Sequence, residues 1–198
     1  MAEQIDIRPA RKTDASEMVA LIDCAGYGMP LWVWSGMRKD EPSVLEVGRK
    51  RAIRDEGGFS WRNAHILEVD GTPAGMLIGY RIDDPYDMGD LAKTPEAFRP
   101  LVELEAQVPG SWYINVLAVH GEYRGRGFGA RLLEHADALA RASGAPTVSV
   151  IFEDRNEGAY RLYRRSGFRE VTRRQRVPIP NDFTGSREWV LLAKPLGN

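Results

Sequence analysis

The feature that most constrains the fold is a glycine-rich turn between an apolar run and an amphipathic segment. The stretch VHGEYRGRGFGARLL follows the apolar run SWYINVLAV and leads into ARLLEHADALARA, whose apolar residues recur at helical spacing. Gly125, Gly127 and Gly129 stand at every second position of this turn. Glycines are expected where a backbone curls tightly or approaches another molecule closely. The pattern therefore predicts a strand that passes through a tight loop into a helix.

Such a loop is a candidate anion site. The free amides of a first helical turn point at a ligand, the helix dipole favours negative charge, and glycines keep side chains away from the backbone. A plain turn is the alternative, although it seldom needs three alternating glycines. The loop lacks the Gly-Lys-Ser/Thr of nucleotide triphosphatases. A dinucleotide fingerprint, matched from Gly125 to Ala130, stays open but disfavoured, because residues 120–124 separate it from the strand.

Strand and helix patterns interleave along the whole chain, which favours an α/β fold with a mixed sheet. The predicted strands are QIDIRPA, the hairpin AHILEVDGTPAGMLIGYRID, SWYINVLAV, TVSVIFE, FREVTRRQRVPI and REWVLLAKP. The predicted helices are TDASEMVALID, SVLEVGRKRAIRDEGG, ARLLEHADALARA and NEGAYRLYRRSG. The segment GYGMPLWVWSGM is interpreted as an irregular connection.

Residues 83–109 interrupt this alternation of strand and helix patterns. They begin with the acidic loop DDPYDMGD and continue as TPEAFRPLVELEAQVPG, a helical pattern that Pro100 should kink or split. We interpret the segment as an insertion within a single domain that covers residues 1–198.

Composition excludes several classes of protein. The formal net charge of -1 argues against a nucleic-acid binder, and no apolar run is long enough to span a bilayer. The first residues lack the pattern of a secretory signal, so a cytoplasmic location is expected. Cys24 is the single cysteine of the sequence, which leaves no internal disulfide and no cysteine-built metal site. We expect no metal cofactor.

The glycine loop and a second, later motif together make the pattern specific. The stretches INVLAVHGEYRGRGFGARLL and VSVIFEDRNEGAYRLYRRSGFREV resemble the GNAT superfamily of acyl-CoA-dependent N-acyltransferases. Its loop motif Arg/Gln-x-x-Gly-x-Gly/Ala is matched by Arg124, Gly127 and Gly129. Its later signature is matched by Asn156, Ala159, Tyr163, Gly167 and Phe168. The resemblance is strong over residues 111–172, rests on strand order alone over 4–82, and is absent from 83–109. Gly121 stands where many relatives have proline.

The resemblance implies a mixed, mostly antiparallel sheet of about seven strands flanked by helices. Strands four and five, here residues 111–119 and 147–153, would splay apart and admit the pantetheine arm of acetyl-CoA. The amides of Arg126, Gly127, Gly129 and Ala130 would hold the pyrophosphate. The full set expected to bind the coenzyme is Leu117, Ala118, Val119, Arg124, Gly125, Arg126, Gly127, Phe128, Gly129, Ala130, Asn156 and Tyr163.

The implied reaction is direct attack of a primary amine on the thioester in a ternary complex. Tyr163 would donate a proton to the departing thiolate, and its alternative role is that of a core tyrosine. Relatives often use a glutamate near strand four to take the amine's proton, which makes Glu103 and Glu105 candidates, with His120 as an outsider. Solvated helix surface is the alternative for both glutamates.

Substrate choice is expected to come from the divergent parts of the chain. Tyr27, Trp32 and Trp34 lie where the family's first two helices form a lid, and they are candidates to contact a small-molecule or peptide amine, with core filling as the alternative. A non-catalytic module that binds or senses acyl-CoA is a second functional hypothesis. The pairing of subunits common in the family makes a homodimer a further expectation.

Overall fold

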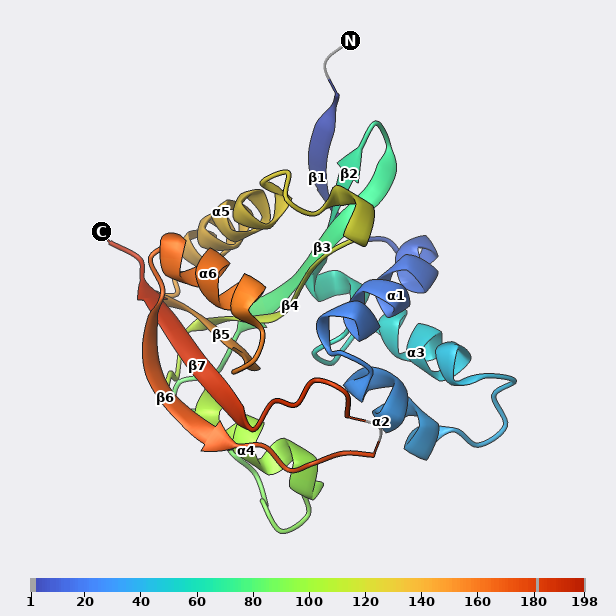
Figure 1. Ribbon diagram of the computed structural model, residues 1–198, viewed down its shortest axis with the longest axis vertical. Helices are drawn as coiled ribbons and strands as arrows, with labels where there is room; N and C mark the ends of the chain where they lie inside the picture. The colour runs from blue at the N-terminus through green and yellow to red at the C-terminus, as the bar shows by residue number, and fades with distance from the viewer. Residues whose placement is uncertain (1–2, 181, 198) are drawn as a thin grey trace. The chain divides into compact units, whose positions relative to one another are not determined.

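Seven strands form one mixed sheet in the order β1-β2-β3-β4-β5-β7-β6 in a computed structural model that describes residues 3–180 and 182–197 (Figure 1). β4 and β5 run parallel and pair from Trp112 to Ile114, whereas β1 with β2, β2 with β3, β5 with β7 and β6 with β7 are antiparallel. The strands are β1 Ile5–Pro9, β2 Ala64–Val69, β3 Thr72–Arg81, β4 Trp112–Val119, β5 Thr147–Glu153, β6 Arg169–Gln175 and β7 Glu188–Pro195. The predicted fold class is confirmed.

Helices separate most of the strands along the chain. They are α1 Ala15–Ala25, α2 Met29–Met37, α3 Val44–Ala52, α4 Arg99–Glu105, α5 Phe128–Ala142 and α6 Glu157–Arg165, with short 3-10 turns η1 Lys12–Asp14, η2 Trp61–Asn63, η3 Glu96–Phe98 and η4 Gly121–Tyr123. None of the helices in the described part of the chain has the length and apolar character that crossing a bilayer requires.

The prediction of an irregular connection over GYGMPLWVWSGM was wrong, because α2 occupies most of it. Gly28, with φ of 85°, precedes the helix, and Pro30 lies in its first turn, where the missing amide costs nothing. The glycine and proline that indicated a loop are therefore the start signals of a helix.

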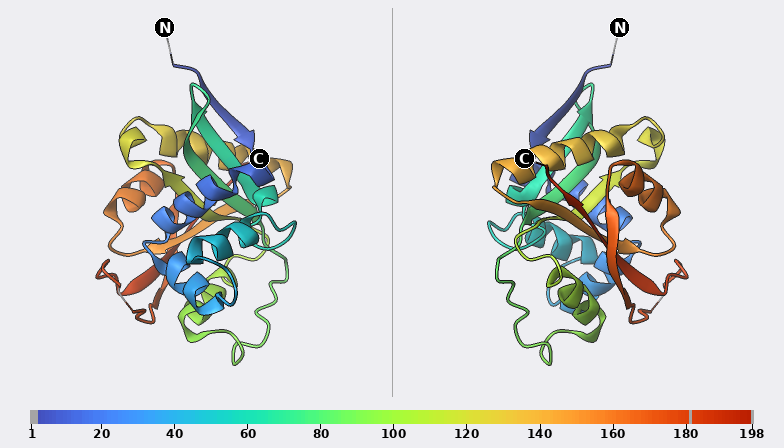
Figure 2. Two further views of the ribbon diagram at one scale, coloured as in Figure 1. Left: turned by 90° about the vertical axis from the view of Figure 1, so that its right-hand side faces the viewer. Right: turned by 90° about the vertical axis from the view of Figure 1, so that its left-hand side faces the viewer.

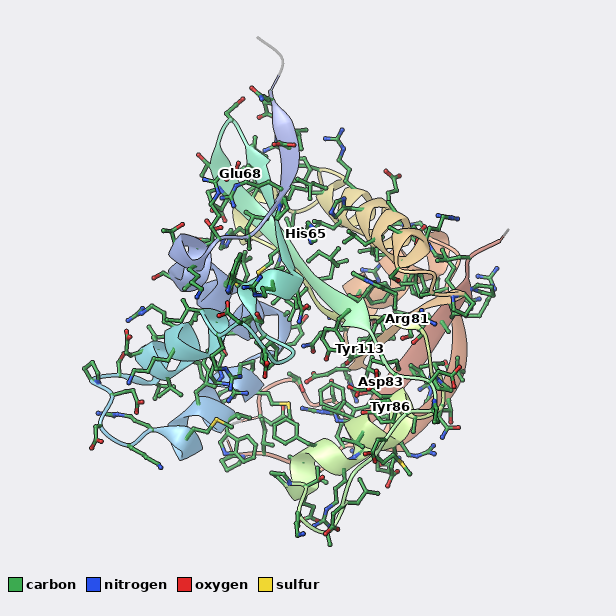
Figure 3. The ribbon with its side chains drawn as sticks, turned by 180° about the vertical axis from the view of Figure 1, so that it is seen from behind. His65, Glu68, Arg81, Asp83, Tyr86 and Tyr113 are labelled. Carbon is green, nitrogen blue, oxygen red and sulfur yellow. The ribbon has the colours of Figure 1, made fainter. Side chains whose placement is uncertain are left out.

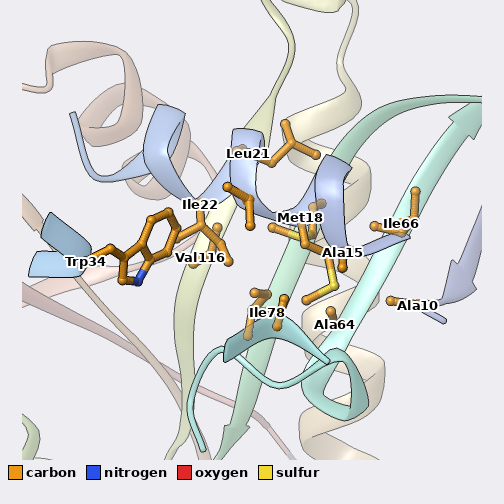
Figure 4. Close-up of a cluster of buried hydrophobic side chains, with 14 of the residues drawn as sticks. Ala10, Ala15, Met18, Leu21, Ile22, Trp34, Ala64, Ile66, Ile78 and Val116 are labelled. Carbon is orange, nitrogen blue, oxygen red and sulfur yellow. The ribbon is translucent and has the colours of Figure 1, made fainter. Parts of the chain in front are cut away.

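Contacts divide the described residues into two compact units, of which the first covers 3–79 and 115–132. In this unit α1, α2 and α3 pack against one another (Figure 2). Their apolar faces and the inner residues of β2, β3 and β4 form a core around the fully buried Met18, Ile22 and Trp34 (Figure 4). Burial of such side chains is the main stabilising contribution to a unit of this kind.

The second unit covers the described residues 80–114, 133–180 and 182–197. The interrupted helical pattern of 95–109 is split as predicted, into η3 and then α4, with Pro100 in the first turn of α4. The buried hydroxyls of Ser111 and Ser149 form a 2.7 Å hydrogen bond beside the paired ends of β4 and β5. The single domain with an insertion at 83–109 stays a prediction.

Candidate functional site

The loop between β4 and α5 has the backbone that its glycines predicted. Gly125 and Gly127 have φ of 77° and 83°, in the left-handed region that other residues rarely adopt. A Cβ added at either glycine would meet no atom of the described residues within 4 Å. The space beside the loop backbone is open, and α5 starts at the next residue, Phe128.

The amides of this loop are available to an anion. Within the first unit, residues 3–79 and 115–132, no hydrogen bond from the five amides from Gly125 to Gly129 to a protein acceptor is found. Ala130 differs, because its amide donates to the carbonyl of Gly127 at 3.1 Å, and the amide of Arg131 donates to the same carbonyl at 3.2 Å. The expected donors Arg126, Gly127 and Gly129 thus remain available, Phe128 joins them, and the Ala130 amide is engaged within the helix.

The arginine side chains of the loop have partners within the first unit. Arg124 donates from Nε to the carbonyl of Val119 at 3.1 Å and from Nη2 to Cys24 Sγ of α1 at 3.2 Å. Arg126 forms an ion pair with Glu3, and its guanidinium carbon lies 4.9 Å from the centre of the Phe128 ring. These two side chains brace the loop backbone.

The end of β4 is fixed on two sides. The His120 ring pairs with Glu17 of α1, and the His120 amide donates to the carbonyl of Ala74 at 2.9 Å. Ala118 is buried, whereas Leu117 and Val119 are half-buried. The backbone at the start of the glycine loop is therefore held in place by these contacts. The splay of β4 from β5 stays a prediction.

Glu105, the last residue of α4, is half-buried in the second unit. The Tyr86 hydroxyl donates to its Oε2 at 2.5 Å. Burial raises the pKa of Glu105, and the hydrogen bond from Tyr86 partly offsets this rise by stabilising the charged form. A carboxyl group whose pKa lies above its ordinary value is suited to take a proton from an amine.

Tyrosines surround this carboxylate. Tyr80 of β3 and Tyr113 of β4 form an edge-to-face pair with ring centres 5.9 Å apart. Burial first, and then the negative charge of Glu105, raise the pKa of both phenols. Figure 3 shows Tyr86 and Tyr113 in the same region of the second unit, with Asp83 drawn between them. We call Tyr80, Tyr86, Glu105 and Tyr113 the tyrosine–carboxylate cluster.

Glu103 has a different environment from Glu105. Its Oε2 accepts a hydrogen bond from Arg174 Nε of β6 at 3.1 Å, and 42% of its side chain is exposed. An ion pair of this exposure contributes little to stability, but it engages the Glu103 carboxylate with the Arg174 side chain. The structure thus separates two glutamates that the sequence left equivalent.

Tyr163 lies on α6, and Asn156 is the residue directly before this helix. Asn156 caps the helix, since its side-chain oxygen accepts from the Ala159 amide at 3.1 Å. Tyr163 is 5% exposed, and its ring centre lies 5.6 Å from those of both Phe152 and Phe168. Aromatic rings on both sides fix the plane of the phenol.

The three aromatic residues expected to contact substrate lie in different environments. Trp34 is 1% exposed, and a Cβ on Gly48 of α3 would lie 2.8 Å from its ring. Such burial makes Trp34 a core residue, its alternative role. Tyr27 is 50% exposed at the turn between α1 and α2, and Trp32 on α2 is partly exposed.

Sequence reasoning did not single out Tyr80, Tyr86 or Tyr113. Tyr80 and Tyr113 stand in two predicted strands, which is a weak signal; the register that brings their rings together is seen in the structure, where the amide of Ile82 donates to the carbonyl of Ser111 at 3.0 Å. The position of Tyr86 in an acidic loop gave no comparable signal.

Comparison with known proteins identifies relatives. A family model described as "Acetyltransferase (GNAT) family" matches residues 30–168. The tRNA(Met) cytidine acetyltransferase TmcA of Aeropyrum pernix is 32% identical over 136 residues, which are 67% of this chain and 18% of that protein. The chain therefore spans less than a fifth of the length of this curated relative.

Solved structures share the fold at low sequence identity. A polyamine N-acetyltransferase of Drosophila melanogaster has a TM-score of 0.69 at 16% identity, with 98% of this chain and 100% of that chain covered. The ribosomal-protein-S18-alanine N-acetyltransferase of Escherichia coli has a TM-score of 0.60 at 18% identity, with 98% and 96% covered. These likenesses establish the architecture alone.

Proposed function

Because this chain belongs to the acetyltransferase (GNAT) family, we propose that it transfers the acetyl group of acetyl-CoA to a primary amine by direct attack in a ternary complex. The family uses acetyl-CoA as co-substrate. The observation that carries the proposal is the loop of five available amides with two left-handed glycines, which suits a diphosphate.

The coenzyme would be held by backbone groups. The amides of Arg126, Gly127, Phe128 and Gly129 would bind the pyrophosphate, and the helix dipole of α5 adds a favourable field there. Leu117, Ala118 and Val119 would pair with the pantetheine through their backbone, as the family resemblance implies. Bound acetyl-CoA supplies the thioester. Arg124 and Arg126 support the loop, since their side chains already contact protein groups.

Proton transfer would fall to two side chains of the second unit. An ammonium group cannot attack a thioester, so a base must take its proton first. We assign this role to Glu105, whose raised pKa and partial burial support it, in preference to Glu103. We assign to Tyr163 the donation of a proton to the leaving thiolate, which the family signature and the packing of its ring support.

The acceptor class is a primary amine of a small molecule or a protein. Tyr27 and Trp32 remain the aromatic residues proposed to contact it, since both are accessible. The name of the Aeropyrum pernix relative refers to a cytidine of tRNA, so an RNA acceptor belongs in any test. A homodimer stays part of the proposal, to be measured by sedimentation velocity.

The test is thiol release from acetyl-CoA with a panel of alkyl amines, polyamines, peptide amino termini and a tRNA transcript. We expect release with at least one primary amine, and a rise in melting temperature with coenzyme A but not with NAD. A coenzyme-dependent rise in melting temperature without thiol release on any acceptor would favour the non-catalytic module. A rise with NAD alone would favour the dinucleotide interpretation.

A further inference from the structure

Tyr86 and Glu105 both lie in residues 83–109, the segment that has no counterpart in the family resemblance. The segment leaves β3 at a fixed point: the Ile82 amide donates to the carbonyl of Ser111 at 3.0 Å, and the Gly110 amide donates to that of Asp83 at 3.1 Å. Tyr86 itself is half-buried. The backbone three residues before Tyr86 is therefore held by hydrogen bonds, and the phenol contacts the carboxylate from that point.

The hydrogen bond from Tyr86 gives the two oxygens of the Glu105 carboxylate different environments. Oε2 accepts from the Tyr86 hydroxyl at 2.5 Å, and within the described residues of the second unit this is the hydrogen bond found at the Glu105 carboxylate. Oε1 is left to take a proton from an amine. A carboxylate with one fixed oxygen has fewer orientations to lose when it meets the substrate.

The other titratable groups around Glu105 cannot replace this bond. Tyr80 from β3 and Tyr113 from β4 act on it through charge, and neither donates a hydrogen bond to it within the described residues. On α4 itself, Glu103 is paired with Arg174 of β6. Asp83, on the segment that carries Tyr86, adds a further negative charge that acts on the Tyr86 phenol.

We propose that Tyr86 is a positioning residue that orients the Glu105 carboxylate and keeps it in the charged form that accepts the proton of the acceptor amine. The inference rests on the proposed role of Glu105 as the base. The proton passes from the ammonium nitrogen to Glu105 Oε1 and then to solvent, while the Tyr86 hydroxyl keeps its own proton. The segment 83–109 thereby serves the reaction directly.

The experiment is the pH profile of kcat/KM for Tyr86→Phe against the unmodified protein. Loss of the hydrogen bond removes a term that lowers the pKa of Glu105, so the acid limb should move to higher pH. At a pH within that limb we expect kcat/KM to fall by about tenfold, with recovery on the alkaline side and an unchanged KM for acetyl-CoA. Tyr160→Phe, which removes the hydroxyl of a 38% exposed tyrosine on α6, is the matched control.

A second variant keeps the shape of the side chain. Incorporation of 3-fluorotyrosine at position 86 makes the phenol a stronger donor, so the acid limb should move to lower pH. The pH profile of the 3-fluorotyrosine variant tests the role of Tyr86 even where Tyr86→Phe proves unstable. An unmoved limb in both variants, or a loss of equal size at every pH, would overturn the inference. Failure of the proposed base is distinguishable, because Glu105→Gln would then remain active.

Discussion

The glycine loop and the tyrosine–carboxylate cluster are built in opposite ways. The loop, residues 120–127, together with the first two residues of α5 offers backbone amides whose directions follow from two left-handed glycines, Gly125 and Gly127. The cluster joins four side chains from β3, the loop between β3 and η3, α4 and β4. A backbone site binds an anion of known shape, whereas a cluster of titratable side chains sets proton affinities.

This difference predicts a separation of effects. Changes in the loop should alter the affinity for coenzyme and leave the rate at saturation unchanged. Changes in the cluster should alter the rate and its pH dependence and leave coenzyme affinity unchanged. The predictions below run from the largest effect on the reaction to the smallest.

Glu105→Gln should lower kcat/KM by about 10²- to 10⁴-fold, because the amide cannot take the amine's proton. In the unmodified protein the rate should fall as the pH falls through the raised pKa of Glu105, and the variant should lose this dependence. Glu103→Gln, which removes only an exposed ion pair, should cost less than about threefold. Steady-state kinetics over a pH series measures both. Equal losses in the two variants would break the distinction between the glutamates.

Tyr163→Phe should lower kcat by about 100-fold with acetyl-CoA, because the thiolate then departs without its proton donor. An acetyl thioester of a more acidic thiol needs less help to depart, so the loss should shrink with such a donor. Comparison of the two thioesters in single-turnover experiments tests the role. A loss that does not depend on the leaving group would indicate a purely structural tyrosine.

Gly127→Ala should raise the KM for acetyl-CoA by about tenfold, because an L-residue at φ of 83° costs about 1–2 kcal/mol and adds a methyl group beside the amides. Gly185→Ala is matched in strain, with φ of 64° in the β6–β7 connection and open space around it. Both variants should lose comparable thermal stability, but only Gly127→Ala should change the KM. A similar change of KM in Gly185→Ala would attribute the effect to general destabilisation.

Arg124→Ala should raise the KM for acetyl-CoA by only two- to threefold, about the value of one lost hydrogen bond to the Val119 carbonyl. The change should depend weakly on salt, because the side chain braces the loop. The KM measured at two ionic strengths separates the alternatives. A loss above tenfold that disappears at high salt would mean that Arg124 meets the phosphates directly.

The elements that the sequence predicted are those whose signals are local. The glycine turn, the helix within NEGAYRLYRRSG, the split at Pro100 and the hairpin around Asp70 and Gly71 each depend on the conformational preferences of a few adjacent residues. The prediction for the α2 segment was wrong because it, too, relied on local preferences alone. Pro30 and Gly28 are compatible with a loop and with a helix start, and the tertiary packing of Trp34 decides between them.

The cluster was beyond local reasoning. Glu103 and Glu105 are two residues apart on one short helix, and only the position of Arg174 on β6 and of Tyr86 in the preceding segment distinguishes them. Tyr80 and Tyr113 become neighbours through a strand register that depends on how the intervening 83–109 segment closes. Side-chain environments that arise from several distant segments carry no periodic signature in the sequence.

The most direct measurement is an amide NMR titration of the protein with coenzyme A and, separately, with pantetheine, which lacks the diphosphate. We predict that coenzyme A displaces the resonances of the five amides from Gly125 to Gly129 and that pantetheine leaves them in place. Binding of coenzyme A with these five resonances unmoved would contradict the assignment of the loop as the diphosphate site.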